Sequence, residues 1–311
     1  MKLAFVFPGQ GSQQIGMMDD FAADAGVRAT FEEASEALGE DLWALAANGP
    51  SEAINLTRNT QPLMLTADVA IWRAWRAAGG PVPSILAGHS LGEYAALVAA
   101  GALELRDAVP LVRFRAEVMQ DAVGPGVGAM AAIMGAEDAA VVDACREAAQ
   151  GEVVEPANFN APGQLVIAGN KAAVERAIVA AKARGAKRGV MLPVSAPFHS
   201  SLLKAAGERL AQQLAKVNIV SPGIVVVHNV DVAEHSTPDA IRIALAGQAA
   251  NPVRWTETIR AFAARGVTHV VECGPGKVLS GLVRRIDGDL TALALNDRAS
   301  LDETRGAVAA A

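Results

Sequence analysis

Residues 84–103, SILAGHSLGEYAALVAAGAL, place one serine between two glycines, where one apolar run ends and another begins. The run SILAG predicts a short buried strand, and the run LGEYAALVAAGAL predicts a helix. The letters GHSLG at 88–92 fit the G-x-S-x-G pattern, which requires this strand–turn–helix context. So sharp a turn strains the backbone of Ser90, and the two glycines leave room for it. The segment therefore predicts an α/β sheet with Ser90 at the end of one strand.

The rest of the chain repeats this alternation of apolar strands and helices. Between them, residues 126–195 predict the order βαββαβ, which is the ferredoxin-like arrangement. We therefore expect a hydrolase-like parallel-sheet domain, 1–125 and 196–311, that is interrupted by a small ferredoxin-like domain at 126–195. The main domain is expected to contain strands at 3–7, 84–88, 224–229, 268–274 and 291–295, and helices at 91–103, 106–123, 199–214 and 255–265.

One helix before residue 80 carries Thr30 and Glu33 at the spacing of a capping box, which predicts a helix start at Thr30.

Composition excludes several classes of protein. The 311 residues are 51% hydrophobic with a formal net charge of −6, which allows a large core and argues against a nucleic-acid partner. The apolar run at 3–7 is too short for a signal peptide, and longer apolar runs fall short of a membrane span. Cys145 and Cys273 lack metal-ligand spacing and are expected to be reduced and buried. We expect a cytoplasmic monomer that binds no metal.

A serine nucleophile needs a base, and His199 is the best candidate among five histidines. His199 follows a predicted strand and begins a predicted helix, where the positive helix end favours a neutral ring. His89 adjoins Ser90 but points away from it in this turn. Structural roles are the safer interpretation for the remaining three, His228, His235 and His269. The N–H of Leu91, at the start of the helix, can donate to an oxyanion on a substrate.

Arg115 lies on the apolar face of the predicted helix 106–123. No acidic residue stands three or four positions from it, whereas Arg113 belongs to the polar face. A buried guanidinium without an anion is costly, so an anion is expected to meet it. That anion is either a carboxylate from elsewhere in the fold or a carboxylate of the substrate. In a third alternative, the Arg115 side chain extends along the apolar surface until its guanidinium reaches solvent.

Eight motifs, taken together and in this order, resemble the malonyl-CoA:acyl carrier protein transacylase family of bacterial fatty-acid synthesis. The resemblance runs from residue 3 to about 295. The motifs are FVFPGQGSQ, GHSLGEYAAL, RFRAEVMQ, GAMAAIMG, NFNAPGQLVIAG, APFHS, QAANPVRW and ECGPGKVL.

The resemblance implies roles for the residues singled out above. Ser90 corresponds to the nucleophile, His199 to its base, and Arg115 to the residue that binds the malonyl carboxylate. Gln248 corresponds to a residue whose backbone carbonyl orients the histidine. The implied reaction is ping-pong transfer of a malonyl group from malonyl-CoA to the phosphopantetheine thiol of acyl carrier protein, through a malonyl-Ser90 intermediate.

The resemblance also implies that the backbone N–H of Gln10 joins that of Leu91 in an oxyanion hole, and that Asn160 lines the cleft between the two domains. Phe198, beside the proposed base, is expected to narrow the pocket, although the sequence does not decide strictly between malonyl and methylmalonyl groups. GPGK at 274–277 lacks the spacing of a phosphate-binding loop, and we expect no cofactor.

Three alternatives share some of these features. One is the acyltransferase component of a polyketide or malonate-processing system, and another is a serine thioesterase that would use Asp138 or Asp143, both of which look exposed. The third is a carrier-binding subunit without catalytic activity.

An acidic carrier protein would require a basic patch on this acidic chain. The candidates are Lys182, Arg184, Lys187 and Arg188 on the small domain, with Arg284 and Arg285 after the GPGK turn.

Overall fold

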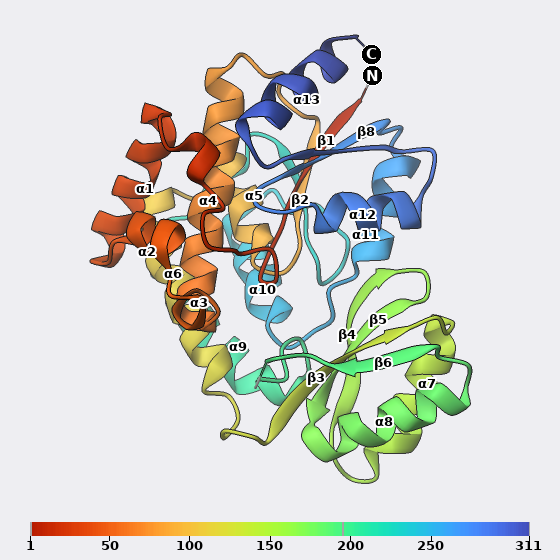
Figure 1. Ribbon diagram of the computed structural model, residues 1–311. Coiled ribbons are helices and arrows are strands. Elements are labelled where there is room, and N and C mark those ends of the chain that lie inside the picture. The colour runs from red at the N-terminus through yellow and green to blue at the C-terminus, as the bar shows by residue number, and fades with distance from the viewer. Residues whose placement is uncertain (1, 195, 311) are drawn as a thin grey trace.

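Two β-sheets organise the molecule, as the computed structural model of residues 2–194 and 196–310 shows (Figure 1). The larger sheet is parallel throughout, with the strand order β7-β2-β1-β8-β9. Its strands are β1 (Leu3–Phe7), β2 (Ile85–Gly88), β7 (Val225–Val227), β8 (His269–Cys273) and β9 (Thr291–Leu295).

Strand β1 lies at the centre of this sheet and is buried along its whole length. Phe5 and Phe7 pack on one side with Trp72 of α4, whereas Ala4 and Val6 pack on the other side with α11 and α12. Side chains alternate between the faces of a strand, so a continuous apolar run is what a sheet covered on both faces requires.

Helices cover both faces of the parallel sheet (Figure 1). Helix α1 (Ala25–Leu38) begins after Asp24, whose side chain accepts hydrogen bonds from the N–H groups of Gly26 and Val27, and it ends at Gly39, which has a φ of 73°. The helices of this part are the 3₁₀ turn η1 (Asp19–Phe21), α1 (Ala25–Leu38), α2 (Leu42–Asn48), α3 (Ser51–Ile54), α4 (Thr57–Ala77), α5 (Gly92–Ala99), α6 (Leu105–Gln120), the 3₁₀ turn η2 (Ser201–Leu203), α9 (Lys204–Leu214), α10 (Pro238–Gln248), α11 (Trp255–Ala264), α12 (Val278–Ile286) and α13 (Arg298–Ala310).

The smaller sheet is antiparallel, with the order β4-β5-β3-β6, and two helices cover one of its faces (Figure 1). Its elements are β3 (Gly128–Met134), α7 (Asp138–Ala149), β4 (Val154–Ala161), β5 (Gln164–Asn170), α8 (Lys171–Ala183) and β6 (Arg188–Met191). This order of elements confirms the ferredoxin-like fold class. The domain boundaries at 125/126 and 195/196 remain predictions.

Strand β4 connects the small antiparallel sheet to the main part of the molecule. Asn158 forms a parallel bridge with Val253, and the N–H of Phe159 donates to the Val253 carbonyl at 2.9 Å. Thr256 of α11 also donates its hydroxyl to the Phe159 carbonyl at 3.0 Å. These contacts attach one strand of the small sheet to the start of α11 and to the segment that precedes it.

Several local predictions were wrong. Thr30 does not begin a helix, because Asp24 caps α1 six residues earlier; the Thr30 hydroxyl donates to the Gly26 carbonyl, and Glu33 pairs with Arg73. The helix after Ser90 ends at Ala99 rather than 103. The helix predicted for 199–214 is a 3₁₀ turn followed by α9.

The described residues also bear on the expectations from composition. Cys145 and Cys273 are buried and form no disulfide, as expected. None of the helices in the described part of the chain has the length and apolar character that crossing a membrane needs. Among residues 2–194 and 196–310, no three His, Cys, Asp or Glu side chains are grouped to hold a metal ion.

Candidate active site

Ser90 stands at the carboxyl end of β2, in the strained turn that the motif predicts. Its φ is 52°, a value that residues other than glycine rarely adopt. A Cβ on Gly88 would lie 1.9 Å from the carbonyl carbon of Gly92, and a Cβ on Gly92 would lie 2.0 Å from the carbonyl oxygen of Phe7. Only glycine therefore fits at both positions, and the turn packs directly against β1.

His199 contacts Ser90, although 109 residues separate them. The Ser90 Oγ lies 2.7 Å from Nε2 of the ring, and Nδ1 lies 2.9 Å from the backbone carbonyl oxygen of Gln248. A carbonyl can only accept, so Nδ1 carries the hydrogen and Nε2 is left with a free lone pair. The pair is therefore arranged for transfer of the serine proton to His199.

The environment keeps this ring neutral. His199 is 3% exposed, and burial together with the charge of Arg115 lowers its pKa to about 3. A helix end was expected to keep the ring neutral, but the helical turn after His199 is a short 3₁₀ turn. Burial and a neighbouring guanidinium are the actual causes.

Arg115 projects from α6 and is 1% exposed. Its Nη1 donates to Oε1 of Gln61 at 2.7 Å. Its Nη2 donates to Oε1 of Gln248 at 2.8 Å and to Oγ of Ser90 at 3.1 Å. In the described part of the chain, no carboxylate lies within hydrogen-bonding distance of this guanidinium. The protein thus surrounds a buried cation with neutral acceptors, right beside the serine.

One cavity of about 130 Å³ brings these groups together. Six of the predicted site residues line it, which are Gln10, Ser90, Leu91, Arg115, Phe198 and His199. The sequence argument did not include the other lining residues, Gln61, His89, Met119, Met130, Asn158, Leu192 and Val194. Gln248 lies behind the cavity wall and touches it through Ser90, Arg115 and His199.

Comparisons with known proteins identify the family of this chain. Residues 4–286 match the acyl transferase domain. The chain is 56% identical to the malonyl CoA-acyl carrier protein transacylase of Escherichia coli (strain K12), over 96% of this chain and 97% of that protein. It superimposes on the acyl-carrier-protein S-malonyltransferase of Burkholderia pseudomallei 1710b with a TM-score of 0.97 and 60% identity, covering 98% and 100% of the two chains.

The chain belongs to the malonyl-CoA:acyl carrier protein transacylase family. A further structural relative is a malonyl-transacylase in complex with its type II polyketide acyl carrier protein. It is 51% identical, with a TM-score of 0.97 over 99% of this chain and 100% of that one.

Within this transacylase fold, three predicted positions have unexpected surroundings. Asn160 accepts a hydrogen bond from Nε2 of His89 at 2.8 Å, whereas Asn158, two residues earlier on β4, lines the cavity. This contact also explains why His89 points away from Ser90. Arg113 is not on an exposed face, because it is 8% exposed and its two terminal nitrogens bind Glu40 at 2.8 and 2.6 Å. Asp138 is partly buried rather than exposed.

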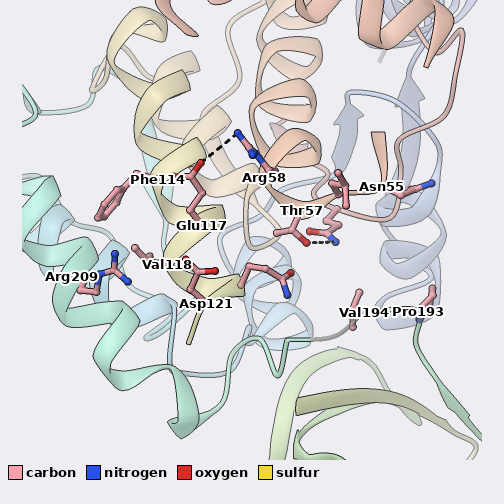
Figure 2. Close-up of a pocket in the computed structure, with 13 residues that line it drawn as sticks. Asn55, Thr57, Arg58, Phe114, Glu117, Val118, Asp121, Pro193, Val194 and Arg209 are labelled. Carbon is pink, nitrogen blue, oxygen red and sulfur yellow. Dashed lines mark hydrogen bonds and ion pairs between the residues drawn. The ribbon is translucent and has the colours of Figure 1, made fainter. Parts of the chain in front are cut away.

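A second cavity of about 700 Å³ adjoins the first and shares Gln10 and Val194 with it (Figure 2). Arg58 and Glu117 line this cavity and form an ion pair at 3.9 Å, which a dashed line marks in Figure 2, and Arg209 lies beside Phe114. None of Ser90, His199 or Arg115 lines it. The larger cavity therefore lacks the groups for nucleophilic chemistry, which the smaller one contains.

Sequence reasoning missed a set of polar residues beneath the serine turn, namely Glu93, Asn229 and the side chain of Gln248. Asn229 accepts from the Ser90 N–H at 2.7 Å and donates to the Gly88 carbonyl at 2.7 Å. One signal was available, because Asn229 follows β7, and the carboxyl ends of parallel strands gather at one edge of a sheet.

Proposed function

We propose that this chain transfers the malonyl group of malonyl-CoA to the phosphopantetheine thiol of acyl carrier protein. The observation that carries the proposal is one cavity in which a serine–histidine pair faces a buried guanidinium, with no carboxylate of the described residues within hydrogen-bonding distance of that guanidinium. A malonyl thioester supplies the reacting carbonyl and, one methylene away, the missing carboxylate.

In the first half-reaction, Ser90 Oγ attacks the thioester carbonyl while Nε2 of His199 takes the hydroxyl proton. The oxyanion that forms is held by the backbone N–H groups of Leu91 and Gln10. The carbon–sulfur bond then breaks, the proton passes from His199 to the sulfur of coenzyme A, and a malonyl ester remains on Ser90.

In the second half-reaction, His199 removes the proton of the carrier thiol, and the sulfur attacks the ester carbonyl. The bond to Ser90 breaks, and the proton returns to the serine oxygen. Each step moves an acyl group between oxygen and sulfur, so the reaction uses only side-chain and backbone groups of this chain and no cofactor.

Arg115 selects the substrate in two ways. A malonyl carboxylate pairs with the guanidinium, whereas an acetyl group leaves that buried charge facing no anion. The charge of Arg115 also lowers the pKa of His199. A carboxylate bound at Arg115 counteracts that charge and makes His199 a stronger base when the correct acyl group is present.

We also propose that the enzyme works in the cytoplasm, which the two unpaired buried thiols support. Ser90, His199 and Arg115 all come from one chain, so the proposed chemistry needs no second subunit; the monomeric state itself remains a prediction.

A transfer assay tests the function against its nearest alternative, hydrolysis. Malonyl-CoA is mixed with holo acyl carrier protein and the chain, and malonylated carrier and free malonate are both quantified. We expect malonylated carrier from the wild type and none from Ser90→Ala. Rapid release of malonate without carrier would favour a thioesterase, and full activity of Ser90→Ala would exclude a serine mechanism.

A further inference from the structure

A fully buried polar network lies directly beneath the active site. It consists of Glu93 in the first turn of α5, His228 and Asn229 after β7, and Gln248 at the end of α10, all with an exposure of 0%. Buried polar groups are costly unless they are paired, so a network of this size at one site calls for a functional or structural explanation.

Glu93 is the centre of this network. Its Oε1 lies 2.7 Å from Nδ1 of His228. Its Oε2 accepts from the backbone N–H of Asn229 at 2.9 Å and from Nε2 of Gln248 at 2.8 Å. The carboxylate therefore connects two of the residues that touch the reacting groups.

Gln248 contacts Ser90, His199 and Arg115. Its Nε2 also donates to the backbone carbonyl of Ser90 at 2.9 Å, its Oε1 accepts from Arg115 at 2.8 Å, and its backbone carbonyl faces Nδ1 of His199 at 2.9 Å. A rotation of this one amide would disturb the contact with Arg115 directly.

The chemistry of the partners permits only one orientation of the Gln248 amide. Arg115 can only donate, so it requires the amide oxygen. The Glu93 carboxylate can only accept, so it requires the amide nitrogen. Glu93 and the Ser90 carbonyl both accept from the amide nitrogen, so the carboxylate is one of two acceptors that keep the NH₂ group away from the guanidinium, and removing it weakens the hold on this orientation.

We propose that Glu93 is a positioning residue for malonyl selection, which it achieves by fixing Gln248 so that Arg115 is held beside Ser90. The inference rests on the function proposed above and adds a residue to its specificity. Through the N–H of Asn229, the same carboxylate also anchors the side chain that holds the Ser90 backbone.

Three substitutions at position 93 separate this role from a general need for a buried acid. Glu93→Ala removes both acceptors. Glu93→Asp keeps the carboxylate but withdraws it by roughly 1.5 Å, about one carbon–carbon bond. Glu93→Gln can keep every contact: its oxygen accepts from Asn229 and Gln248, and its NH₂ donates to His228, whose Nε2 can then carry the ring proton.

Glu272→Gln is the matched control. Glu272 is also 0% exposed and accepts from two backbone N–H groups, those of Leu279 and Ser280 at 3.0 and 2.7 Å. It does not line either cavity beside Ser90. Its replacement therefore changes a carboxylate that is as buried as that of Glu93 but makes no contact with Gln248.

The measurement is kcat/KM with malonyl-CoA and with acetyl-CoA, each with holo acyl carrier protein, and the ratio of the two. We expect Glu93→Ala to reduce the malonyl preference by about tenfold or more, the loss expected when one hydrogen bond to a charged group is disturbed. Glu93→Gln should recover most of the preference, and Glu272→Gln should leave the ratio as it is in the wild type.

Equal losses with both substrates in Glu93→Ala would assign Glu93 a merely structural role and overturn the proposal. If Glu93→Ala does not fold, Glu93→Asp decides: a reduced malonyl preference supports the proposal, and an unaltered one contradicts it. A wild-type chain that does not transfer malonyl groups would instead refute the proposed function.

Discussion

Replacing Arg115 with methionine tests the selection of a carboxylate by this site. The change removes the guanidinium and keeps a long unbranched side chain in a position that is 1% exposed. Hydrogen bonds to charged groups contribute about 1.5–3 kcal/mol each, and a guanidinium can offer two to one carboxylate. A loss of about 3–5 kcal/mol in transition-state stabilisation lowers kcat/KM for malonyl-CoA roughly 10²- to 10⁴-fold.

Acetyl-CoA is the substrate that separates selection from general damage. It has no carboxylate for Arg115, so its transfer should change far less in Arg115→Met than that of malonyl-CoA. The variant should therefore lose most of its preference for malonyl groups. The assay is transfer to holo acyl carrier protein, with both thioesters measured under the same conditions.

Arg113→Met provides the control on the same helix. Arg113 is also buried but binds Glu40 with both terminal nitrogens and does not line the cavity. We expect Arg113→Met to lower the melting temperature while it retains the malonyl-to-acetyl ratio. If Arg115→Met reduced both activities by the same factor, or left malonyl transfer intact, Arg115 would not be the carboxylate partner.

Three further predictions concern other parts of the site. Because the pKa of His199 is lowered to about 3, the ring stays neutral above that value, and kcat/KM should not fall between about pH 8 and pH 5; a break near the ordinary value of 6.5 would contradict this. Gly92→Ala places a Cβ 2.0 Å from a backbone oxygen of β1 and should lower stability by about 1–3 kcal/mol in a denaturant titration, whereas Gly281→Ala, with open space around it, should not. Charge reversal at the exposed Lys187 and Arg188 should slow transfer to the carrier in a single-turnover assay and spare acylation by malonyl-CoA; equal slowing of both steps would argue against docking there.

The parts of the fold that were predictable from sequence are those with local signals. The apolar runs of the parallel strands and the order βαββαβ follow from periodicity alone, and both are present in the structure. The start of α1 was mispredicted because Asp24, six residues before Thr30, is the residue whose side chain caps this helix. The burial of Arg113 was missed because its partner, Glu40, is 73 residues away.

The site shows the same division between local and distant information. The glycines around Ser90 and the place of Arg115 on an apolar face are local features, and sequence reasoning found both. Two of the three acceptors of Arg115 come from residues 54 and 133 positions away, Gln61 and Gln248, and no pattern within one helix could identify them. The sequence left open whether the anion that meets Arg115 comes from the fold or from the substrate. The structure places the neutral amides of Gln61 and Gln248 there, which favours an anion from the substrate.

The most direct test of the central claim is the intact mass of the chain after mixing with malonyl-CoA alone, followed by addition of holo acyl carrier protein. We predict one malonyl adduct on the wild type, located at Ser90 by peptide mapping, absent from Ser90→Ala, and lost as malonylated carrier appears. An adduct on another residue, or malonyl transfer to the carrier by Ser90→Ala, would contradict the account.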